Sequence, residues 1–327
     1  MQYVRLGRSG LKVSRLCLGS ANMGRPGANA WNLDEAAARP IFETALEAGI
    51  TFFDTANAYS KGASEKLVGK LLGELARRDE IVLATKLASP MGEKPTQRGL
   101  SRKHVMESVD ASLRRLGTDY VDLLITHRWD PETPVEETLA ALDNVVRAGK
   151  ALYLGVSNLY AWQLAKQLFT ADLHGWSRPV AVQNHYNVIY REEEREMAPL
   201  CLDQGIAMTP WSPLARGFVA GNRDRQGSGE TVRAQADAKA RRMYDHEPRF
   251  AIADAAKTVA AGRGLSPIQA ALAWILAKPA IAAPVIGVST PAQLDELIAA
   301  SEVILTPAEV ATLEAPYRPM AMRGMDE

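Results

Sequence analysis

Four ionisable side chains follow one another at or just after the ends of apolar segments. Asp54, Lys86 and His127 each close such a segment, and Tyr59 follows Asp54 by five residues. A tyrosine hydroxyl has an ordinary pKa of about 10, and a cationic lysine beside it favours the phenolate. We expect Asp54 to hold Lys86 charged and in place, because buried charges need partners. Together, these residue types suit proton transfer to or from an oxygen atom at neutral pH.

The same set of residues excludes some kinds of catalysis and favours another. It contains no nucleophile paired with a base, as acyl transfer requires, and no triad of metal ligands. It fits hydride transfer to a carbonyl, with Tyr59 as general acid and a nicotinamide as the hydride donor. His127 would then orient or polarise the carbonyl oxygen. Taken singly, Asp54 is equally well explained as a helix cap, Tyr59 as packing and Lys86 as a solvated charge.

Eight short apolar segments predict buried β-strands. Their hydrophobicity is continuous rather than alternating, which is typical of parallel strands covered on both faces. Segments with helical spacing separate them, so we predict an α/β protein with a (β/α)8 TIM barrel. A doubly wound sheet is less favoured, because no Gly-x-Gly-x-x-Gly follows the first segment. The predicted strands are 15–19, 50–54, 81–86, 121–127, 151–157, 180–184, 206–211 and 283–287, and the predicted helices include 33–48, 101–116, 135–148, 159–173, 192–204, 266–277 and 291–300.

Two segments interrupt the alternation of strands and helices. Residues 2–13 have the pattern of a β-hairpin, which would close the bottom of the barrel. Residues 214–247 follow the seventh strand, are rich in Gly, Arg, Asp and Gln, and predict a long loop. We expect this loop to act as a lid at the catalytic end, where the carboxyl ends of the strands bring the four ionisable side chains together. The alternative is a surface insertion without a role.

The composition limits the class of protein. The chain has 327 residues, 38 Lys and Arg against 38 Asp and Glu, and 47% hydrophobic residues. Its neutrality argues against nucleic-acid and membrane partners, and no apolar stretch reaches the length of a membrane span. Two cysteines and a start without an apolar leader predict a reduced, cytoplasmic protein. The length admits two average domains or one large barrel, and we predict a single domain over 1–327.

Several motifs resemble those of the aldo-keto reductases. The segment GITFFDTANAYSKGASEKLVG at 49–69 resembles the family's first signature, and ATK at 84–86 and ITH at 125–127 match the next two strands. The similarity continues to the end of the chain in GVSN, QNHYN, PWSPLARG and IGVSTPAQLDE. Within the family, HRWD, YREEERE and PWSPLARG look most similar to the bacterial YajO-type subgroup.

The resemblance implies an NAD(P)H-dependent reductase of aldehydes and ketones that also oxidises alcohols, with no Rossmann domain. Tyr59 would be the proton donor, and Asp54 and Lys86 would tune it. The residues implied in binding the nicotinamide dinucleotide are Gly19, Ser20, Asp54, Ser157, Asn158, Gln183, Trp211, Ser212, Pro213, Leu214, Arg216, Gly217, Gly287, Ser289, Thr290, Gln293 and Glu296. The dinucleotide is anionic, so the arginines of the predicted loop should lie near it: Arg216, Arg223, Arg225, Arg233, Arg241 and Arg242.

The choice of cofactor follows from the same resemblance. The resemblance favours NADP(H), the cofactor that is usual in the family. NAD(H) stays open, because Thr290 and Gln293 stand where many NADP-specific relatives carry an arginine. A guanidinium matches the oxygens of a 2′-phosphate better than either of these side chains does.

The substrate and the physiological role stay open. Trp31, Trp129 and His185 are candidates for the wall of a pocket that takes a small carbonyl compound, and no metal is expected. Two other functions are weighed. A redox-sensing subunit of the potassium-channel β type would keep the same four residues, and the subgroup name suggests formation of 1-deoxyxylulose-5-phosphate. The thiamine-dependent chemistry of that reaction usually needs a Gly-Asp-Gly motif, which is absent. The sequence leaves the oligomeric state open.

Overall fold

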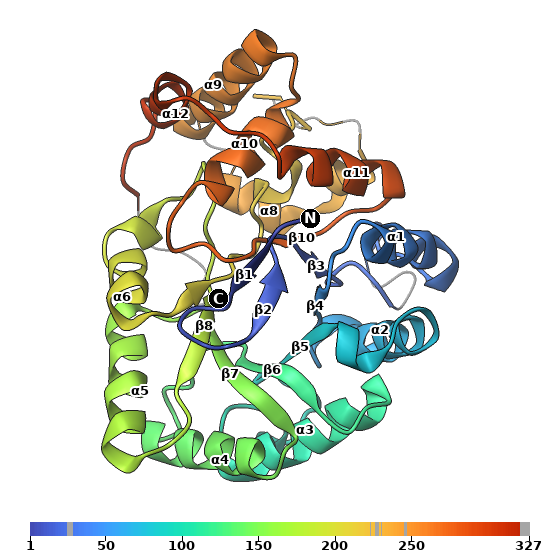
Figure 1. The fold of residues 1–327 in the computed structure, drawn as a ribbon, viewed down its shortest axis with the longest axis vertical. Coiled ribbons are helices and arrows are strands. Elements are labelled where there is room, and N and C mark those ends of the chain that lie inside the picture. Colours follow the sequence, from blue (N-terminus) through green and yellow to red (C-terminus); the bar gives the residue numbers. More distant parts are fainter. Residues whose placement is uncertain (25–28, 223, 226–228, 230, 245–246, 321–327) are drawn as a thin grey trace.

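The computed structural model describes residues 1–24, 29–222, 224–225, 229, 231–244 and 247–320. Eight parallel strands form one sheet in the order β10-β3-β4-β5-β6-β7-β8-β9, and helices surround it (Figure 1). Bridges between Met208 and Ile281 and between Trp211 and Val285 join its two edges. The predicted α/β barrel is confirmed. The strands are β3 (Cys17–Gly19), β4 (Phe52–Asp54), β5 (Val82–Leu87), β6 (Val121–Thr126), β7 (Ala151–Ser157), β8 (Pro179–Gln183), β9 (Ala207–Met208) and β10 (Val285–Ile286).

The seven helices predicted by range lie at their expected positions, except for the start of one, and the structure adds α2, α7, α8, α9 and α12. Local signals define several ends: Ser101 caps the third helix by accepting from the backbone of His104, and Gly117 ends it in the left-handed region. The predicted helix 192–204 is wrong at its start: Glu192–Glu194 form a 3-10 turn, and the α-helix begins only at Met197, after the non-helical backbone of Glu196. The helices are α1 (Glu35–Glu47), α2 (Ala63–Leu75), α3 (Arg102–Leu116), α4 (Val135–Arg147), α5 (Ala161–His174), α6 (Met197–Gln204), α7 (Val232–Ala236), α8 (Ala238–Tyr244), α9 (Glu247–Arg263), α10 (Pro267–Leu276), α11 (Pro291–Ala300) and α12 (Pro307–Glu314).

The predicted N-terminal hairpin is also confirmed. β1 (Tyr3–Arg5) pairs antiparallel with β2 (Lys12–Ser14) and lies across the centre of the strand ring (Figure 1). Leu6 and Val13 are fully buried in one apolar cluster with Cys17 and Phe52, near the beginnings of the barrel strands. Burial of this apolar surface makes the hairpin a plug at the amino end of the barrel.

The segment 214–247 follows β9, as predicted, but it is not an irregular loop. It contains α7 and α8, and α9 begins at its end. The side chain of Thr231 accepts from the backbone of Ala234 and that of Asp237 from Ala240, so each caps the start of a helix. These capping residues lie in a polar stretch, which hides the helices from a search for apolar periodicity.

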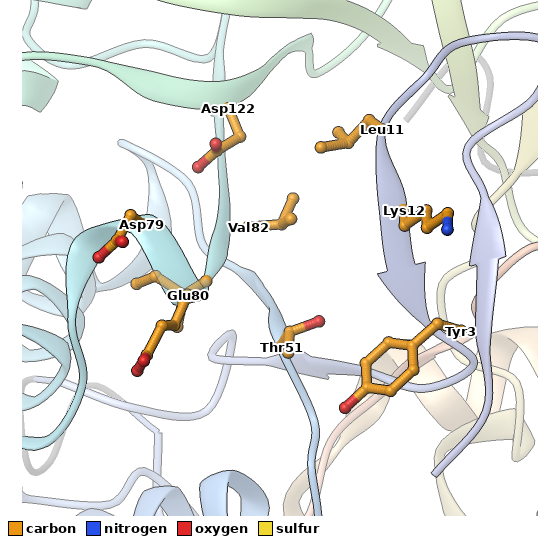
Figure 2. A pocket seen from close by; sticks show the side chains of 9 residues that line it. Tyr3, Leu11, Lys12, Thr51, Asp79, Glu80, Val82 and Asp122 are labelled. Carbon is orange, nitrogen blue, oxygen red and sulfur yellow. The ribbon is translucent and has the colours of Figure 1, made fainter.

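A shallow pocket lies at the amino end of the barrel, between β2 and the start of β5 (Figure 2). Tyr3, Lys12 and Asp122 contribute to its wall. The carboxylate of Asp122 already pairs with Arg78 and accepts from the backbone of Leu83. Lys12 of the hairpin and Val82, the first residue of β5, both line the pocket. The pocket therefore lies at the end of the barrel opposite to the strand ends that carry the ionisable residues.

Among the described residues, none of the helices combines the length and apolar composition that crossing a bilayer requires.

Candidate active site

Lys86 is the centre of a buried polar cluster at the carboxyl end of the barrel. Its ammonium donates to the carboxylate of Asp54, to the backbone oxygen of Thr55 at 2.8 Å and to the hydroxyl of Tyr59 at 3.2 Å. The side chains of Lys86 and Asp54 are 0% and 1% exposed. A lysine has three donor hydrogens, so each has a partner and the ammonium is held in one position.

His127 completes the group from the neighbouring strand. Its ring centre lies 5.7 Å from that of Tyr59, and the two rings are nearly perpendicular. Its backbone N–H donates to Leu87, and Asn158 donates to its backbone oxygen at 2.8 Å. Parallel pairing of β4, β5 and β6 therefore brings together Asp54, Tyr59, Lys86 and His127, although 73 positions separate the first from the last.

Burial controls the protonation of the two rings. It raises the pKa of Tyr59, and the ammonium of Lys86 only partly opposes that rise, so the phenol is protonated at neutral pH. We expected Lys86 to favour the phenolate, but desolvation of the buried hydroxyl outweighs it. Burial, followed by the charges of Lys86, Arg128 and Lys239, holds the pKa of His127 well below its ordinary value, so its imidazole is neutral.

The charge of Lys86 survives its burial. Burial alone would lower the pKa of Lys86, but Asp54, together with Tyr59, raises it above its ordinary value. The cluster thus contains a neutral phenol, a neutral imidazole and an ammonium–carboxylate pair. Such a set can donate a proton from Tyr59 and stabilise the phenolate that remains.

A second group of polar side chains lies next to this cluster. Gln183 donates from its amide to the free oxygen of Asp54 at 2.9 Å, and Ser157 donates to the backbone oxygen of Gln183 at 2.6 Å. Asn158 donates to Ser157 at 2.9 Å and accepts from the indole of Trp211 at 3.0 Å. The network fixes these side chains beside Asp54, where the amide group of a nicotinamide would find donors and acceptors.

The backbone is strained at the same place. Asn158 has φ 52° and Ser212 has φ 53°, both in the left-handed region that residues with a Cβ rarely adopt. Such conformations cluster at functional sites, where the surrounding structure enforces them.

Trp211 belongs to an aromatic stack. Its ring lies 4.4 Å from that of His185, which in turn lies 4.3 Å from Tyr190. The hydroxyl of Tyr244, on α8, lies 2.5 Å from Nε2 of His185, and the amide of Asn187 donates to the same nitrogen at 3.1 Å. Because Nε2 accepts from an amide, the proton of the neutral imidazole lies on Nδ1.

His185 is therefore not on the open surface of a pocket. It is 1% exposed and lies inside the stack, where its contacts hold the indole of Trp211. The other two pocket candidates, Trp31 and Trp129, lie outside this aromatic stack. Trp31 is half-buried, with the guanidinium of Arg233 5.7 Å from its ring centre, and Trp129 packs edge-on against Trp162.

The segment after β9 brings Arg216 to the carboxyl end of the barrel. Arg216 has φ 56°, and its guanidinium pairs with Asp237 at 2.5 Å. Its Nε is buried and has no hydrogen-bond partner among the described residues. Gly19 ends β3, and the hydroxyl of the next residue, Ser20, donates to the backbone oxygen of Asp54. Ser212, Pro213, Leu214 and Gly217 lie on the same stretch of chain as Arg216.

The other predicted arginines of this segment have local partners. Arg233 also pairs with Asp237, Arg225 pairs with Glu247 and Asp254, and Arg241 donates to backbone oxygens of α7. Arg223 lies outside the described residues. Most of the described arginines thus stabilise the segment itself, which leaves Arg216 as the one with a buried, unpartnered donor.

A third part of the predicted site lies at the start of α11. Thr290 caps the helix by accepting from the backbone of Gln293, and Ser289 donates from its backbone to the Gln293 side chain. Gly287 is exposed, and a Cβ built on it would meet nothing within 4 Å. Glu296 is half-buried one turn further along. No arginine or lysine stands among these residues, so the positive end of the helix dipole is the attraction for an anion here.

Sequence reasoning missed several residues near the site. Tyr244, Asp237 and Lys239 come from the segment taken as a loop, and Trp162 comes from α5. Lys239 lies 5.8 Å from the ring centre of Trp211. These residues lie far along the chain from the residues that they contact, so the sequence carries no signal of the contacts. The capping residues Thr231 and Asp237 were the local signs that this segment is helical.

Glu193 is a buried carboxyl group next to the site, and its ionisation should make the stability of the fold depend on pH. Asn184, next to Gln183, donates to its carboxyl at 2.8 Å, and burial raises the pKa of Glu193 to about 8. An unfolded glutamate has a pKa of about 4.3, so the folded state binds the extra proton between these values. The stability this gives is complete below the lower value and is lost as the pH rises through the upper one.

We expect the free energy of unfolding to fall between about pH 6 and pH 8 by about 2 kcal/mol more in the wild type than in Glu193→Gln. The amide mimics the protonated carboxyl and cannot ionise. Urea titrations at both pH values measure the difference. Glu43→Gln, at an exposed position, should follow the wild-type curve. Equal pH dependence of Glu193→Gln and wild type would show that the carboxyl ionises as it does in water.

Comparison with known proteins decides the family. The model of the Aldo/keto reductase family matches residues 15–318. The chain belongs to the aldo/keto reductase family. Aldo/keto reductases use nicotinamide cofactors, generally NADPH, and membership makes the chain an oxidoreductase that acts on carbonyl compounds.

Individual aldo/keto reductases resemble this chain along nearly its whole length. Versiconal hemiacetal acetate reductase of Aspergillus parasiticus is 41% identical, over 98% of both chains. A Saccharomyces cerevisiae protein, AAD16, provisionally named an aryl-alcohol dehydrogenase, is 35% identical over 99% of both. Aldo-keto reductase AMT2 of Alternaria alternata is 37% identical, over 98% of this chain and 93% of its own. These relatives are fungal, so they give no support to the bacterial YajO-type subgroup.

Proposed function

We propose that the chain transfers a hydride reversibly between a nicotinamide cofactor and an aldehyde or ketone, with Tyr59 as the general acid and base. The observation that carries this proposal is the hydroxyl of Tyr59, 3.2 Å from the ammonium of Lys86, which Asp54 holds charged. Tyr59 is the one side chain of the cluster that has a proton to give at neutral pH and a cation beside it that can stabilise the resulting anion.

Each residue has one task in the proposed reaction. Neutral His127 orients the carbonyl oxygen toward the hydroxyl of Tyr59. The reduced nicotinamide, when bound, supplies the hydride to the carbonyl carbon. Tyr59 gives its proton to the oxygen as charge develops there, and Lys86 stabilises the phenolate until solvent returns a proton. In the direction of alcohol oxidation, the phenolate of Tyr59 takes the proton back.

The residues present fit a nicotinamide dinucleotide. Ser157, Asn158 and Gln183 would hold the amide of the nicotinamide, and Trp211 would stack on its ring. The buried Nε of Arg216, which has no partner among the described residues, fits the charge of a pyrophosphate. The proposed adenosine end is the start of α11. Residues 214–247 would cover the site as a lid on the single domain.

We expect NADPH to bind more tightly than NADH. The usual cofactor of the family supports this order, and the positive end of the α11 dipole can attract a 2′-phosphate without an arginine. Calorimetric titration of the protein with each reduced cofactor gives the two dissociation constants. Binding of NADH about tenfold tighter than NADPH would reverse the order.

We propose aromatic aldehydes and ketones as the first substrate class to test. The names of two relatives, a reductase of versiconal hemiacetal acetate and a provisional aryl-alcohol dehydrogenase, support this choice. An aromatic contact contributes about 0.5–1.5 kcal/mol, so kcat/KM for benzaldehyde should exceed that for a linear aldehyde of similar size by up to about tenfold. A carbonyl panel with NADPH and NADH, followed by cofactor absorbance, tests both the reaction and the preference. Oxidation of one equivalent of cofactor followed by a stall would point instead to a redox-sensing subunit.

A further inference from the structure

The side chain of Asn184 is a fully buried amide directly after β8, and both of its polar atoms have partners. Its nitrogen donates to the backbone oxygen of Leu159 at 2.9 Å and to the carboxyl of Glu193 at 2.8 Å. Its oxygen accepts from the backbone N–H of Leu159 at 3.4 Å. These partners fix the orientation of the amide, because the flipped amide would turn its donor hydrogens toward an N–H.

Through Leu159, this amide restrains the strained backbone of Asn158. Asn158 is the preceding residue and has φ 52°. Its side chain donates to the backbone oxygen of His127 at 2.8 Å and accepts from the indole of Trp211 at 3.0 Å. A left-handed conformation persists where the surrounding structure enforces it, and the two hydrogen bonds of Asn184 to the next residue are such a restraint.

The backbone of Asn184 holds the other side of the same site. Its oxygen accepts from the backbone N–H of Trp211 at 3.1 Å. β7 and β8 are neighbouring parallel strands (Figure 1), so Asn184 joins the carboxyl ends of both to the segment that follows β9. One buried residue therefore sets the position in which the side chain of Asn158 meets the indole of Trp211.

Glu193 holds the amide of Asn184 in turn. Its side chain is fully buried, and one of its carboxyl oxygens has no hydrogen-bond partner among the described residues. The other oxygen accepts from Asn184. A buried carboxyl group that makes so few hydrogen bonds is costly, and a side chain that only filled space would be apolar. The hydrogen bond to Asn184 is thus the contact that explains a carboxyl group at this position.

We propose that Asn184 and Glu193 are positioning residues for the nicotinamide end of the cofactor, and that they set Asn158 and Trp211 in their binding geometry before the cofactor arrives. Asn184 has no exposed surface to offer a ligand, so it acts through the two side chains that it holds. The inference rests on the proposed function, which assigns the amide and the ring of the nicotinamide to Asn158 and Trp211. Without the restraint, a fraction of the molecules would keep both side chains in place, and the apparent Kd would rise by the reciprocal of that fraction.

Calorimetric titration with NADPH and with 2′-phospho-ADP-ribose, which is the same dinucleotide without its nicotinamide, tests this role. Asn184→Leu keeps the size of the side chain and removes its hydrogen bonds. We expect it to raise the Kd for NADPH by about tenfold, as when about a tenth of the molecules hold the competent geometry, and the Kd for 2′-phospho-ADP-ribose by less than about twofold. An unchanged Kd for NADPH overturns the inference. An equal rise for both ligands also overturns it, because it would show damage to the whole cofactor site.

Glu193 supplies a second pair of variants, which tests the inference even where Asn184→Leu does not fold. Glu193→Gln keeps an oxygen that can accept from Asn184, so its Kd for NADPH should stay within about twofold of the wild type. Glu193→Met has a similar length and only a weak acceptor, so it should raise that Kd several fold. If the two variants bind NADPH equally well, the hydrogen bond between Glu193 and Asn184 does not position the site.

Asn144→Leu is the matched control for the change of an amide to an apolar side chain. Asn144 lies on α4, where its amide donates to the backbone oxygen of Ala140 at 2.8 Å, and both Kd values should stay at the wild-type level. Far-ultraviolet circular dichroism and Tm show that each variant folds. If the wild type binds NADPH no more tightly than 2′-phospho-ADP-ribose, the proposed nicotinamide contacts fail and the inference fails with them. If the wild type and Asn184→Leu both prefer NADPH to the same extent, the positioning role alone is overturned.

Discussion

Replacing Tyr59 by phenylalanine is expected to lower kcat for carbonyl reduction by about 10²–10⁴-fold, the range for loss of a general acid. The variant keeps the ring beside His127 but removes the hydroxyl 3.2 Å from the ammonium of Lys86. Since the proposed nicotinamide contacts come from Asn158, Gln183 and Trp211, the Kd for NADPH should stay within about twofold of the wild type. Steady-state kinetics and calorimetric titration measure the two quantities separately.

A tyrosine at the other end of the barrel provides the matched control. Tyr3 is 51% exposed, and its hydroxyl donates to the backbone oxygen of Gly49, far from the polar cluster. Tyr3→Phe makes the same chemical change and should leave kcat unaltered. Near-normal turnover by Tyr59→Phe would remove Tyr59 from the mechanism. Loss of cofactor binding together with turnover would instead mean that the hydroxyl organises the binding site.

The second large effect is expected at Lys86, on stability as well as on activity. Lys86→Met leaves the carboxylate of Asp54 buried without its cation, and breaking a buried ion pair in this way costs about 3–5 kcal/mol. Turnover should fall with it, because no cation is left to stabilise the phenolate of Tyr59. The free energy of unfolding, measured in urea, and kcat give the two effects.

Removing both charges separates the two roles of Lys86. In Asp54→Asn/Lys86→Met no unpaired buried charge remains, so most of the lost stability should return while turnover stays low. Lys70→Met is the control for an exposed pair: Lys70 and Glu35 are 52% and 40% exposed, so its loss should cost less than about 1 kcal/mol. If Lys86→Met were as stable as this control, Asp54 would have to be protonated or solvated in the folded protein.

The amino-acid sequence by itself determined the architecture and the reactive residues. Continuous apolar segments and the helical periodicity between them predicted all eight barrel strands, because burial on both faces requires that pattern. The same reasoning placed Asp54, Lys86 and His127 at one mouth, since parallel strands end at the same side of a barrel. Local capping signals such as Ser101 and Gly117 marked helix ends that the structure has.

The tertiary structure decided what depends on contacts between distant segments. Only the fold shows that burial outweighs Lys86 in setting the pKa of Tyr59, since desolvation is a property of the surroundings and not of the residue. It also shows that His185 lies between Trp211 and Tyr190, and that Tyr244 reaches it from a polar segment 59 residues further along the chain. The arginines of that segment looked free to meet an anion in the sequence, and most of those described pair within the segment instead. Composition counts charges, whereas packing decides which of them are already neutralised.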